Sequence, residues 1–237
     1  MLFDVDDGPA TLDESVEMAR AATANGIRIA VSTPHVRSAA DAEPGLFAER
    51  ALTLNRTLRE KGIFMVVLTG AEVTAVAATE IGDELMDNLT LGNSRTVLLE
   101  PPDQDYRLLD EAVFTLQLRG YRVAIAHPER CRIFQRDPEL LDHINARDVA
   151  HIVTAGSLTG DFGRRAKKLA HRMLKADMVT ALCSDAHDPQ RRTPDIEKAR
   201  KAVPGPGDRF ENLTSTNPGN LLSDGVTDNH GGRGVAA

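Results

Sequence analysis

The chain has 237 residues with a formal net charge of −7; 41% of the residues are hydrophobic and only 4% are aromatic. This length allows one large domain with a buried core but not two comfortable ones. The acidic balance and the scarcity of aromatic side chains argue against nucleic-acid binding, which relies on basic patches and stacking platforms.

The cysteines, the apolar runs and the N-terminus favour a cytoplasmic protein. Cys131 and Cys183 lie far apart and form neither a zinc-binding pair nor a disulfide framework. No apolar run reaches transmembrane length, and the acidic N-terminus differs from a signal peptide. We therefore expect a cytoplasmic location without membrane insertion.

The first half of the chain alternates between helical and strand patterns. Thr11 and Glu14 form a capping box, which predicts a helix that ends at Gly26. Apolar runs rich in Val and Ile predict strands at residues 27–33 and 64–69. Helices are predicted at residues 46–61 and within residues 75–88.

The second half continues this alternation. Strands are predicted at residues 96–100, 121–126, 149–155 and 178–184. Helices are predicted at residues 108–119, 138–146, 162–176 and 194–202, with a final packed segment at 209–222. Residues 223–237 are polar and rich in Gly, which predicts a disordered tail. The regular alternation predicts an α/β fold, with a parallel sheet of six strands buried on both faces, in one domain over residues 1–222.

Five of the predicted strands end in residues that can bind a metal. These residues are His35, Glu72, Glu100, His127 and the pair Asp185 and His187. The carboxyl ends of parallel strands meet at one edge of a sheet or barrel, so these side chains are expected to gather there. Mixed imidazole and carboxylate donors suit Mn²⁺, Zn²⁺ or Fe.

Each candidate also has a purely structural interpretation. A single His is more often a hydrogen-bonded structural residue, Asp185 could cap a helix, and Glu72 or Glu100 could pair with an Arg. The recurrence of the same residue types at equivalent strand ends favours the metal site.

Other charged residues suggest a bound anion. Asp6 and Asp7 lie in an acidic turn, which is an ordinary turn when considered alone. Arg130 follows His127 and could bind a phosphate with two N–H groups, or could form a surface ion pair with Glu129 or a neighbouring acid. The same argument applies with less weight to the arginines at 191 and 192. The chain contains no P-loop, no G-x-S-x-G elbow and no C-x5-R phosphatase motif.

Taken together, these motifs resemble the bacterial manganese-dependent tyrosine-protein phosphatases of the polymerase-and-histidinol-phosphatase (PHP) superfamily, which act in capsule and exopolysaccharide control. The resemblance covers residues 2–222. It rests on DVDDGP at residues 4–9, TPH at 33–35, GAE at 70–72, HPER at 127–130, AGSLTG at 155–160 and SDAH at 184–187.

The resemblance implies a distorted (β/α)7 TIM-like barrel with a trinuclear metal centre at its C-terminal mouth. Mn²⁺ is the implied ion, with Zn²⁺, Fe or Co²⁺ as alternatives. Arg130, Asp7 and His35 are implied to be catalytic, and Arg130 and Arg192 to bind the phosphate. The implied ligands form one site of Glu72, Glu100 and His127, a second of Asp7, His35 and His187, and a third that contains Asp185 with Glu72 bridging.

The implied function is the hydrolysis of phosphotyrosine on protein. A metal-bound hydroxide would attack phosphorus in line, without a phosphoenzyme. The implied partner is a bacterial tyrosine kinase of polysaccharide export. One alternative is a PHP-type small-molecule phosphatase such as histidinol phosphatase. Another is a catalytically impaired remnant that binds metal or phosphoprotein.

The sequence departs from the family pattern at its start. The family begins with a strand that carries D-x-H-x-H, whereas this sequence starts at Met1 just after the expected end of that strand. We expect that the start site is assigned too late, in preference to a truncation or a true loss of the strand.

Overall fold

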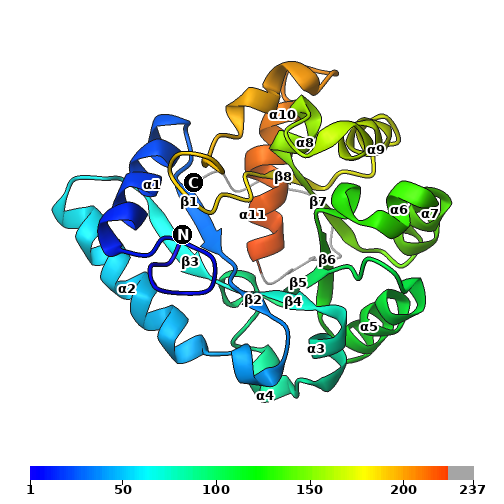
Figure 1. The fold of residues 1–237 in the computed structure, drawn as a ribbon, viewed down its shortest axis with the longest axis horizontal. Coiled ribbons are helices and arrows are strands. Elements are labelled where there is room, and N and C mark those ends of the chain that lie inside the picture. The colour runs from blue at the N-terminus through cyan, green and yellow to red at the C-terminus, as the bar shows by residue number, and fades with distance from the viewer. Residues whose placement is uncertain (224–237) are drawn as a thin grey trace, which may run out of the picture.

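The computed structural model describes residues 1–223, so the tail predicted to be disordered at residues 223–237 lies outside the described residues except for Ser223. The described part confirms the expected α/β class with parallel strands. One cluster of buried apolar side chains extends along the chain from Leu2 to Leu213. Figure 1 shows the helices arranged around the strands, with the C-terminal helix α11 inside this arrangement.

The strands form two parallel sheets with the orders β1-β3 and β2-β4-β5-β6-β7-β8. No hydrogen-bonded ladder joins β8 to β1 within residues 1–223, so the described strands do not form a closed barrel. The strands are β1 (Ile29–Ser32), β2 (His35–Val36), β3 (Val66–Thr69), β4 (Glu72–Thr74), β5 (Thr96–Glu100), β6 (Arg122–Ala126), β7 (Ala150–Thr154) and β8 (Ala181–Cys183).

The first two predicted strands are each followed by a second short strand, which gives eight strands instead of six. β1 and β2 are separated at Pro34, which has no N–H to donate to a ladder. β3 and β4 are separated at Gly70, where an added Cβ would lie 3.1 Å from the Leu91 side chain. The register continues unchanged across both breaks, since Ser32 pairs with Thr69 and His35 pairs with Glu72.

The longer helices follow the sequence prediction, while several connecting segments fold as short turns of helix. In α1, Thr11 accepts from the backbone N–H of Glu14, whose carboxylate reaches back to Ala10 instead of Thr11. The predicted helix at 194–202 is a 3₁₀ helix at Glu197–Ala202. The α-helices are α1 (Leu12–Ala24), α2 (Pro44–Glu60), α3 (Ala75–Glu80), α4 (Asp83–Met86), α5 (Tyr106–Leu118), α6 (Arg132–Arg136), α7 (Glu139–Asn145), α8 (Ala155–Thr159), α9 (Gly163–Lys175), α10 (Arg209–Glu211) and α11 (Asn217–Leu222).

Helix α11 covers the inner face of the larger sheet. Its Leu221 and Leu222 pack against a second apolar cluster, which contains Leu98, Ala124 and Ile152 from three neighbouring strands. The Thr96 hydroxyl and the Arg122 guanidinium donate to backbone carbonyls of α11 and so hold it at the start of β5 and β6. The predicted packed segment at 209–222 therefore packs on the inner face of the sheet, and its last helix is anchored at the N-terminal ends of β5 and β6.

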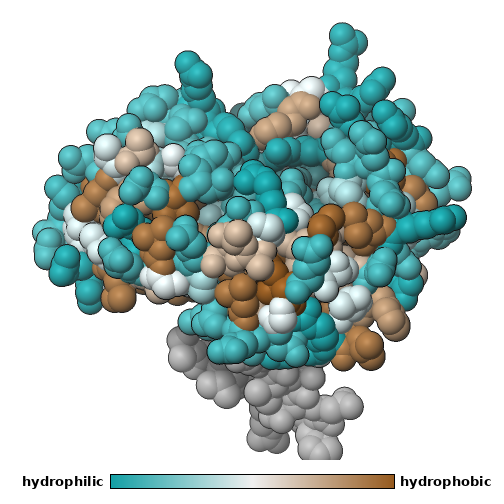
Figure 2. Space-filling view, turned by 60° about the horizontal axis from the view of Figure 1, so that its bottom comes forward, coloured by the Kyte–Doolittle hydropathy of each residue, from teal (hydrophilic) through white to brown (hydrophobic). Residues whose placement is uncertain are grey.

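The expectation that every strand is buried on both faces is wrong for β1 and β3. Ile29 is 57% exposed and Val66 is 49% exposed, because the apolar cluster around α11 reaches Val31 but does not include the start of either strand. Figure 2 shows hydrophobic residues as scattered patches on a mainly hydrophilic face. None of the described helices is long and apolar enough to span a membrane.

Candidate metal centre

A first group of potential ligands lies on three neighbouring strands, since Glu72 begins β4, Glu100 ends β5 and His127 directly follows β6. Glu72, Glu100 and His127 each offer an atom, and these atoms lie within 4.8 Å of one another. Nε2 of His127 lies 2.7 Å from Oε1 of Glu72. Burial raises the pKa of the Glu100 carboxyl, and the negative charge of Glu72 raises it further. The structure thus brings together the three residues that were predicted to share one site.

A second group lies beside the first, at the start of β2, whose first residue is His35. Asp6, Asp7 and His35 also offer atoms within 4.8 Å of one another. Nε2 of His187 lies 3.3 Å from an Asp7 carboxylate oxygen, and the rings of His35 and His187 have centroids 6.3 Å apart. The structure therefore gathers Asp7, His35 and His187 as predicted, and it adds Asp6.

The N-terminal loop holds these aspartates against His35. The Leu2 N–H donates to the Ser32 hydroxyl, and the N–H of Gly8 donates to the carbonyl of Val5. A Cβ on Gly8 would lie 3.1 Å from the Leu2 carbonyl oxygen, so a larger side chain at this position would crowd the backbone of the loop. Asp6 adopts a left-handed φ of 50° at the top of this loop.

Asp6 is the residue that sequence reasoning missed. One carboxylate oxygen lies 2.9 Å from the backbone N of His35 and 2.5 Å from its Nδ1. Burial alone would lower the pKa of His35, but the hydrogen bond to Asp6 and the negative charges of Glu72, Asp6 and Asp7 together outweigh this effect, and the pKa is raised. A carboxylate that accepts from one ring nitrogen leaves the other free to bind a metal. The Asp-Asp pair was a signal, but the sequence could not show that both residues face His35.

His35 and Glu72 connect the two groups. They are directly paired in the parallel ladder between β2 and β4, so the two clusters share one continuous edge. This pairing depends on the bends at Pro34 and Gly70, which carry both strands past the end of the β1-β3 sheet without a change of register. A metal site can therefore extend from Glu100 to His187 on a fixed scaffold.

Asp185, also a candidate metal ligand, lies between His187 and two arginines. Both Arg130 and Arg192 donate to the same Asp185 carboxylate oxygen, and the Arg192 bond is 2.6 Å long. Burial would raise the pKa of Asp185, but the two guanidiniums outweigh this effect and lower it. The Arg130 guanidinium also stacks 4.4 Å from the centre of the Phe162 ring. The structure thus places both predicted phosphate-binding arginines at the cluster, whereas Arg191 is exposed.

A short turn after β6 positions both His127 and Arg130. His127 has a left-handed backbone with φ of 32°, which directs its ring towards Glu72. The next acid, Glu129, is fully buried and accepts from the Thr154 N–H and the Ser157 hydroxyl. The alternative of a surface ion pair between Glu129 and Arg130 is therefore wrong, because Glu129 instead ties the turn to the end of β7.

The donor set fits a divalent metal centre. Its atoms are carboxylate oxygens and imidazole nitrogens, which suit Mn²⁺, Fe or Zn²⁺. Two carboxylates, Glu72 and Glu100, lie close together in a largely buried position, where a cation would relieve their repulsion. This chemistry supports a resident metal on grounds that are independent of any relative.

Comparisons with known proteins agree with this interpretation. The family described as capsular polysaccharide synthesis, CpsB/CapC, matches residues 1–223. Tyrosine-protein phosphatase YwqE of Bacillus subtilis is 36% identical over 79% of this chain and 75% of its own length. The putative tyrosine-protein phosphatase CapC of Staphylococcus aureus is 29% identical over 79% of this chain and 74% of its own length.

A solved structure shows the same fold. It is described among the crystal structures of YwqE from Bacillus subtilis and CpsB from Streptococcus pneumoniae, unique metal-dependent tyrosine phosphatases. It matches with a TM-score of 0.84 and 32% identity, and covers 93% of this chain and 91% of its own.

Proposed function

The chain belongs to the CpsB/CapC family of capsular polysaccharide synthesis, and from this premise we propose that it is a metal-dependent protein-tyrosine phosphatase. The observation that carries the proposal is the convergence of two ligand groups with two arginines. Arg130 and Arg192 both donate to the Asp185 carboxylate, which supports a phosphate-binding edge beside the metal-ligand cluster. The relatives support this activity in preference to the histidinol phosphatase alternative.

The proposed ligands are those that the structure gathers. Glu72, Glu100 and His127 would hold one ion, and Asp7, His35 and His187 a second, with Asp185 and Glu72 at a third. Mn²⁺ is the proposed ion. When bound, the ions supply positive charge and activate a water molecule as the nucleophile.

The arginines would recognise the phosphate. Asp185 holds both guanidiniums side by side, and the stacking of Arg130 on Phe162 restricts its rotation. A guanidinium has five N–H donors, so each arginine retains donors for phosphate oxygens while it contacts Asp185. Nε of Arg192 is buried and has no hydrogen-bond partner among the described residues. This arrangement would orient the phosphate beside the ligand cluster.

The partner, the location and the domain extent complete the proposal. The family description supports a role in capsular polysaccharide synthesis, and we propose a phosphorylated tyrosine kinase of polysaccharide export as the substrate. A cytoplasmic location is supported by two free cysteines, Cys131 and Cys183. The continuous buried core supports one phosphatase domain over residues 1–222.

The test compares two substrates on protein whose metal content has been measured. With Mn²⁺ bound, the chain is expected to hydrolyse a phosphotyrosine peptide and to act at least tenfold more slowly on histidinol phosphate, a difference of about 1.4 kcal/mol in transition-state stabilisation. Faster hydrolysis of histidinol phosphate, or no hydrolysis of either substrate with metal confirmed, would contradict the proposal.

A further inference from the structure

Helix α9 has an exposed face that consists of basic residues. The apolar residues of this helix are all buried, its residues from 164 to 175 that are not apolar are all basic, and it contains no acidic residue. Since an α-helix has 3.6 residues per turn, these basic residues lie on one continuous face. We call the six exposed ones the basic ridge: Arg164, Arg165, Lys167, Lys168, Arg172 and Lys175. They lie in a chain whose net charge is −7.

The rest of the described chain does little to neutralise the ridge. Arg172 lies 3.7 Å from an Asp142 carboxylate oxygen, and this is the single ion pair of the ridge within residues 1–223. Lys167 donates to the neutral Thr159 carbonyl instead of an acid. The ridge is therefore a cationic surface that is open to a partner.

The charges of the ridge oppose one another and the helix dipole. Lys168 lies four residues from both Arg164 and Arg172, a spacing at which like charges destabilise a helix. Arg164 and Arg165 also lie in the first turn, where the dipole favours negative charge. An acidic residue at any of these positions would stabilise the helix better. Local stability therefore does not explain the pattern, whereas a bound anionic partner does.

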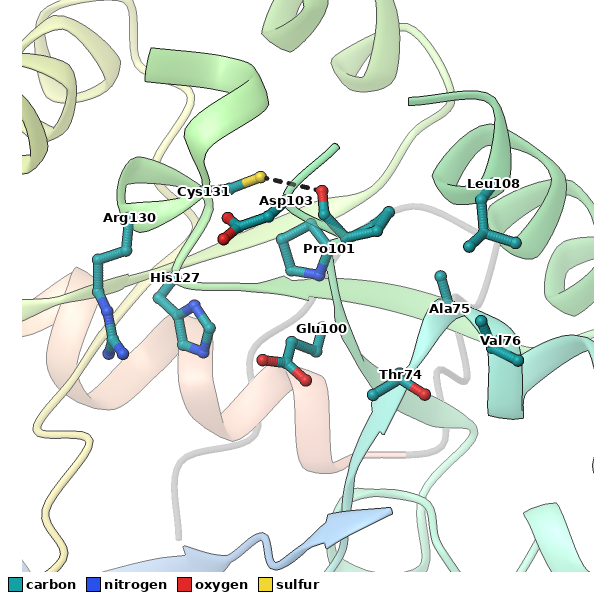
Figure 3. A pocket seen from close by; sticks show the side chains of 11 residues that line it. Thr74, Ala75, Val76, Glu100, Pro101, Asp103, Leu108, His127, Arg130 and Cys131 are labelled. Atoms are coloured by element: carbon teal, nitrogen blue, oxygen red, sulfur yellow. Dashed lines mark hydrogen bonds between the residues drawn. The ribbon is translucent and has the colours of Figure 1, made fainter. Parts of the chain in front are cut away.

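The ridge begins beside the phosphate-binding edge. Phe162 is the N-cap residue of α9, and the centre of its ring lies 4.4 Å from the Arg130 guanidinium. Figure 3 shows Arg130 beside His127 and Glu100, in a cavity that none of the ridge residues lines. A partner on the ridge would thus lie next to the ligand cluster without entering it.

The surroundings of the ridge favour a narrow partner. Helix α7 lies next to α9 (Figure 1) and presents the exposed acids Glu139 and Asp142. A flat anionic membrane on the ridge would also approach these acids, and the ridge has no apolar side chain to insert. A single extended chain can follow the ridge alone. The 13 residues of α9 span about 20 Å, which is the length of about six extended residues.

We propose that the basic ridge of α9 is a docking site for an acidic segment of another protein, an extended stretch rich in Asp or Glu. Its carboxylates pair with the exposed Lys and Arg side chains of the ridge. Exposed ion pairs are individually weak and are screened by salt, so the docking is reversible and depends on several contacts. The inference goes beyond the proposed function, because the ridge contains no candidate metal ligand and no phosphate-binding arginine.

The test measures the binding of two fluorescent peptides to the Mn²⁺-loaded chain by anisotropy. One peptide has about eight residues of alternating Glu and Ser, which places every carboxylate on one side of an extended chain. The other has Gln in place of each Glu. The acidic peptide is expected to bind about tenfold more tightly at low salt, the sum of several exposed ion pairs. Salt at about 0.5 M is expected to remove most of this difference.

The ridge variant combines Arg164→Gln with Lys168→Gln. It is expected to bind the acidic peptide about threefold or more weakly. Its free energy of unfolding is expected to be unchanged or higher, since repulsion within the helix falls. The matched control combines Arg56→Gln with Arg59→Gln, which removes the same charge from two exposed positions on α2. This control is expected to keep the affinity of the unchanged chain.

Equal affinity for the two peptides at low salt would overturn the inference. An unchanged affinity in the ridge variant, or equal losses in the ridge variant and the control, would do the same. Binding to phosphatidylserine vesicles that only the ridge variant loses, without binding of the acidic peptide, would also overturn it and assign the ridge to a membrane surface.

Discussion

Nε2 of His127 lies 2.7 Å from Oε1 of Glu72, although 55 residues separate them in the sequence. Glu72 begins β4 and His127 directly follows β6, and Glu100 at the end of the strand between them completes the group. Burial would lower the pKa of His127, but the hydrogen bond and charge of Glu72 more than offset this effect and raise it. Nearby carboxylates thus already favour positive charge at this position.

Removal of the metal is expected to abolish phosphatase activity. The carboxylates and imidazoles have no nucleophilic role of their own in the proposal, and the sequence contains neither the C-x5-R motif of a cysteine phosphatase nor a G-x-S-x-G elbow. The measurement is hydrolysis of a phosphotyrosine peptide before and after chelation, with recovery after Mn²⁺ is added. Full activity in protein shown to be free of metal would contradict this prediction.

Glu100→Gln is expected to weaken Mn²⁺ binding by about tenfold or more, since it replaces one anionic oxygen of the first group with a neutral amide. Chelator competition measures the affinity, and Glu80→Gln is the matched control because Glu80 is exposed on α3. An affinity equal to that of the unchanged chain would remove Glu100 from the proposed ligand set.

Asp6→Asn is expected to weaken Mn²⁺ binding by about 10- to 100-fold, although Asp6 is not a predicted ligand. Its carboxylate accepts from the His35 ring and backbone, and a neutral amide orients that ring less firmly. Asp4→Asn is the control, because Asp4 lies in the same loop and contacts Arg50 at the surface. Equal losses in both variants would indicate a general disturbance of the loop instead of a specific role for Asp6.

Arg192→Lys is expected to lower kcat/KM for a phosphotyrosine peptide by about 10- to 100-fold, the effect of one or two charge-assisted hydrogen bonds. The loss arises because a lysine cannot contact Asp185 and the phosphate in the same planar geometry. The neighbouring Arg191→Lys is expected to have little effect, since Arg191 is exposed. Similar kinetic constants for both variants would exclude a specific role for Arg192.

His151 is expected to make the fold less stable in acid. The residue is fully buried, neither ring nitrogen has a hydrogen-bond partner among the described residues, and burial lowers its pKa from 6.5 to about 4. The unfolded chain therefore takes up a proton between about pH 6.5 and pH 4 that the folded chain does not. This difference removes at most about 3 kcal/mol of the free energy of unfolding as the pH falls through that range.

Urea unfolding at pH 7 and pH 4.5 measures this effect. His151→Leu is expected to lose less stability between the two pH values than the unchanged chain, whereas the exposed His143→Leu is expected to behave like the unchanged chain. The same pH dependence in all three proteins would show that other groups cause the acid sensitivity.

The local pattern of the sequence was sufficient for the fold class and for most of the candidate ligands. Apolar runs rich in Val and Ile predicted the strands. The residues at the predicted carboxyl ends of these strands included the candidate metal ligands His35, Glu72, Glu100 and His127. These signals are local, because the burial of a strand and the position of its end depend mainly on adjacent residues. The resemblance then identified the family, which the comparison confirms.

The tertiary structure decided which groups face one another. The breaks at Pro34 and Gly70, the cover that α11 provides, and the contact of Asp6 with His35 all depend on segments that are distant in the sequence. The same holds for Asp185, which two arginines approach from different loops. Hydrophobic periodicity determines where a chain folds into strands and helices, but the pairing of polar groups depends on backbone direction and loop geometry. The sequence by itself therefore determined most of the strands and the residue types of the candidate metal centre, and only the folded chain decided which of these groups face one another.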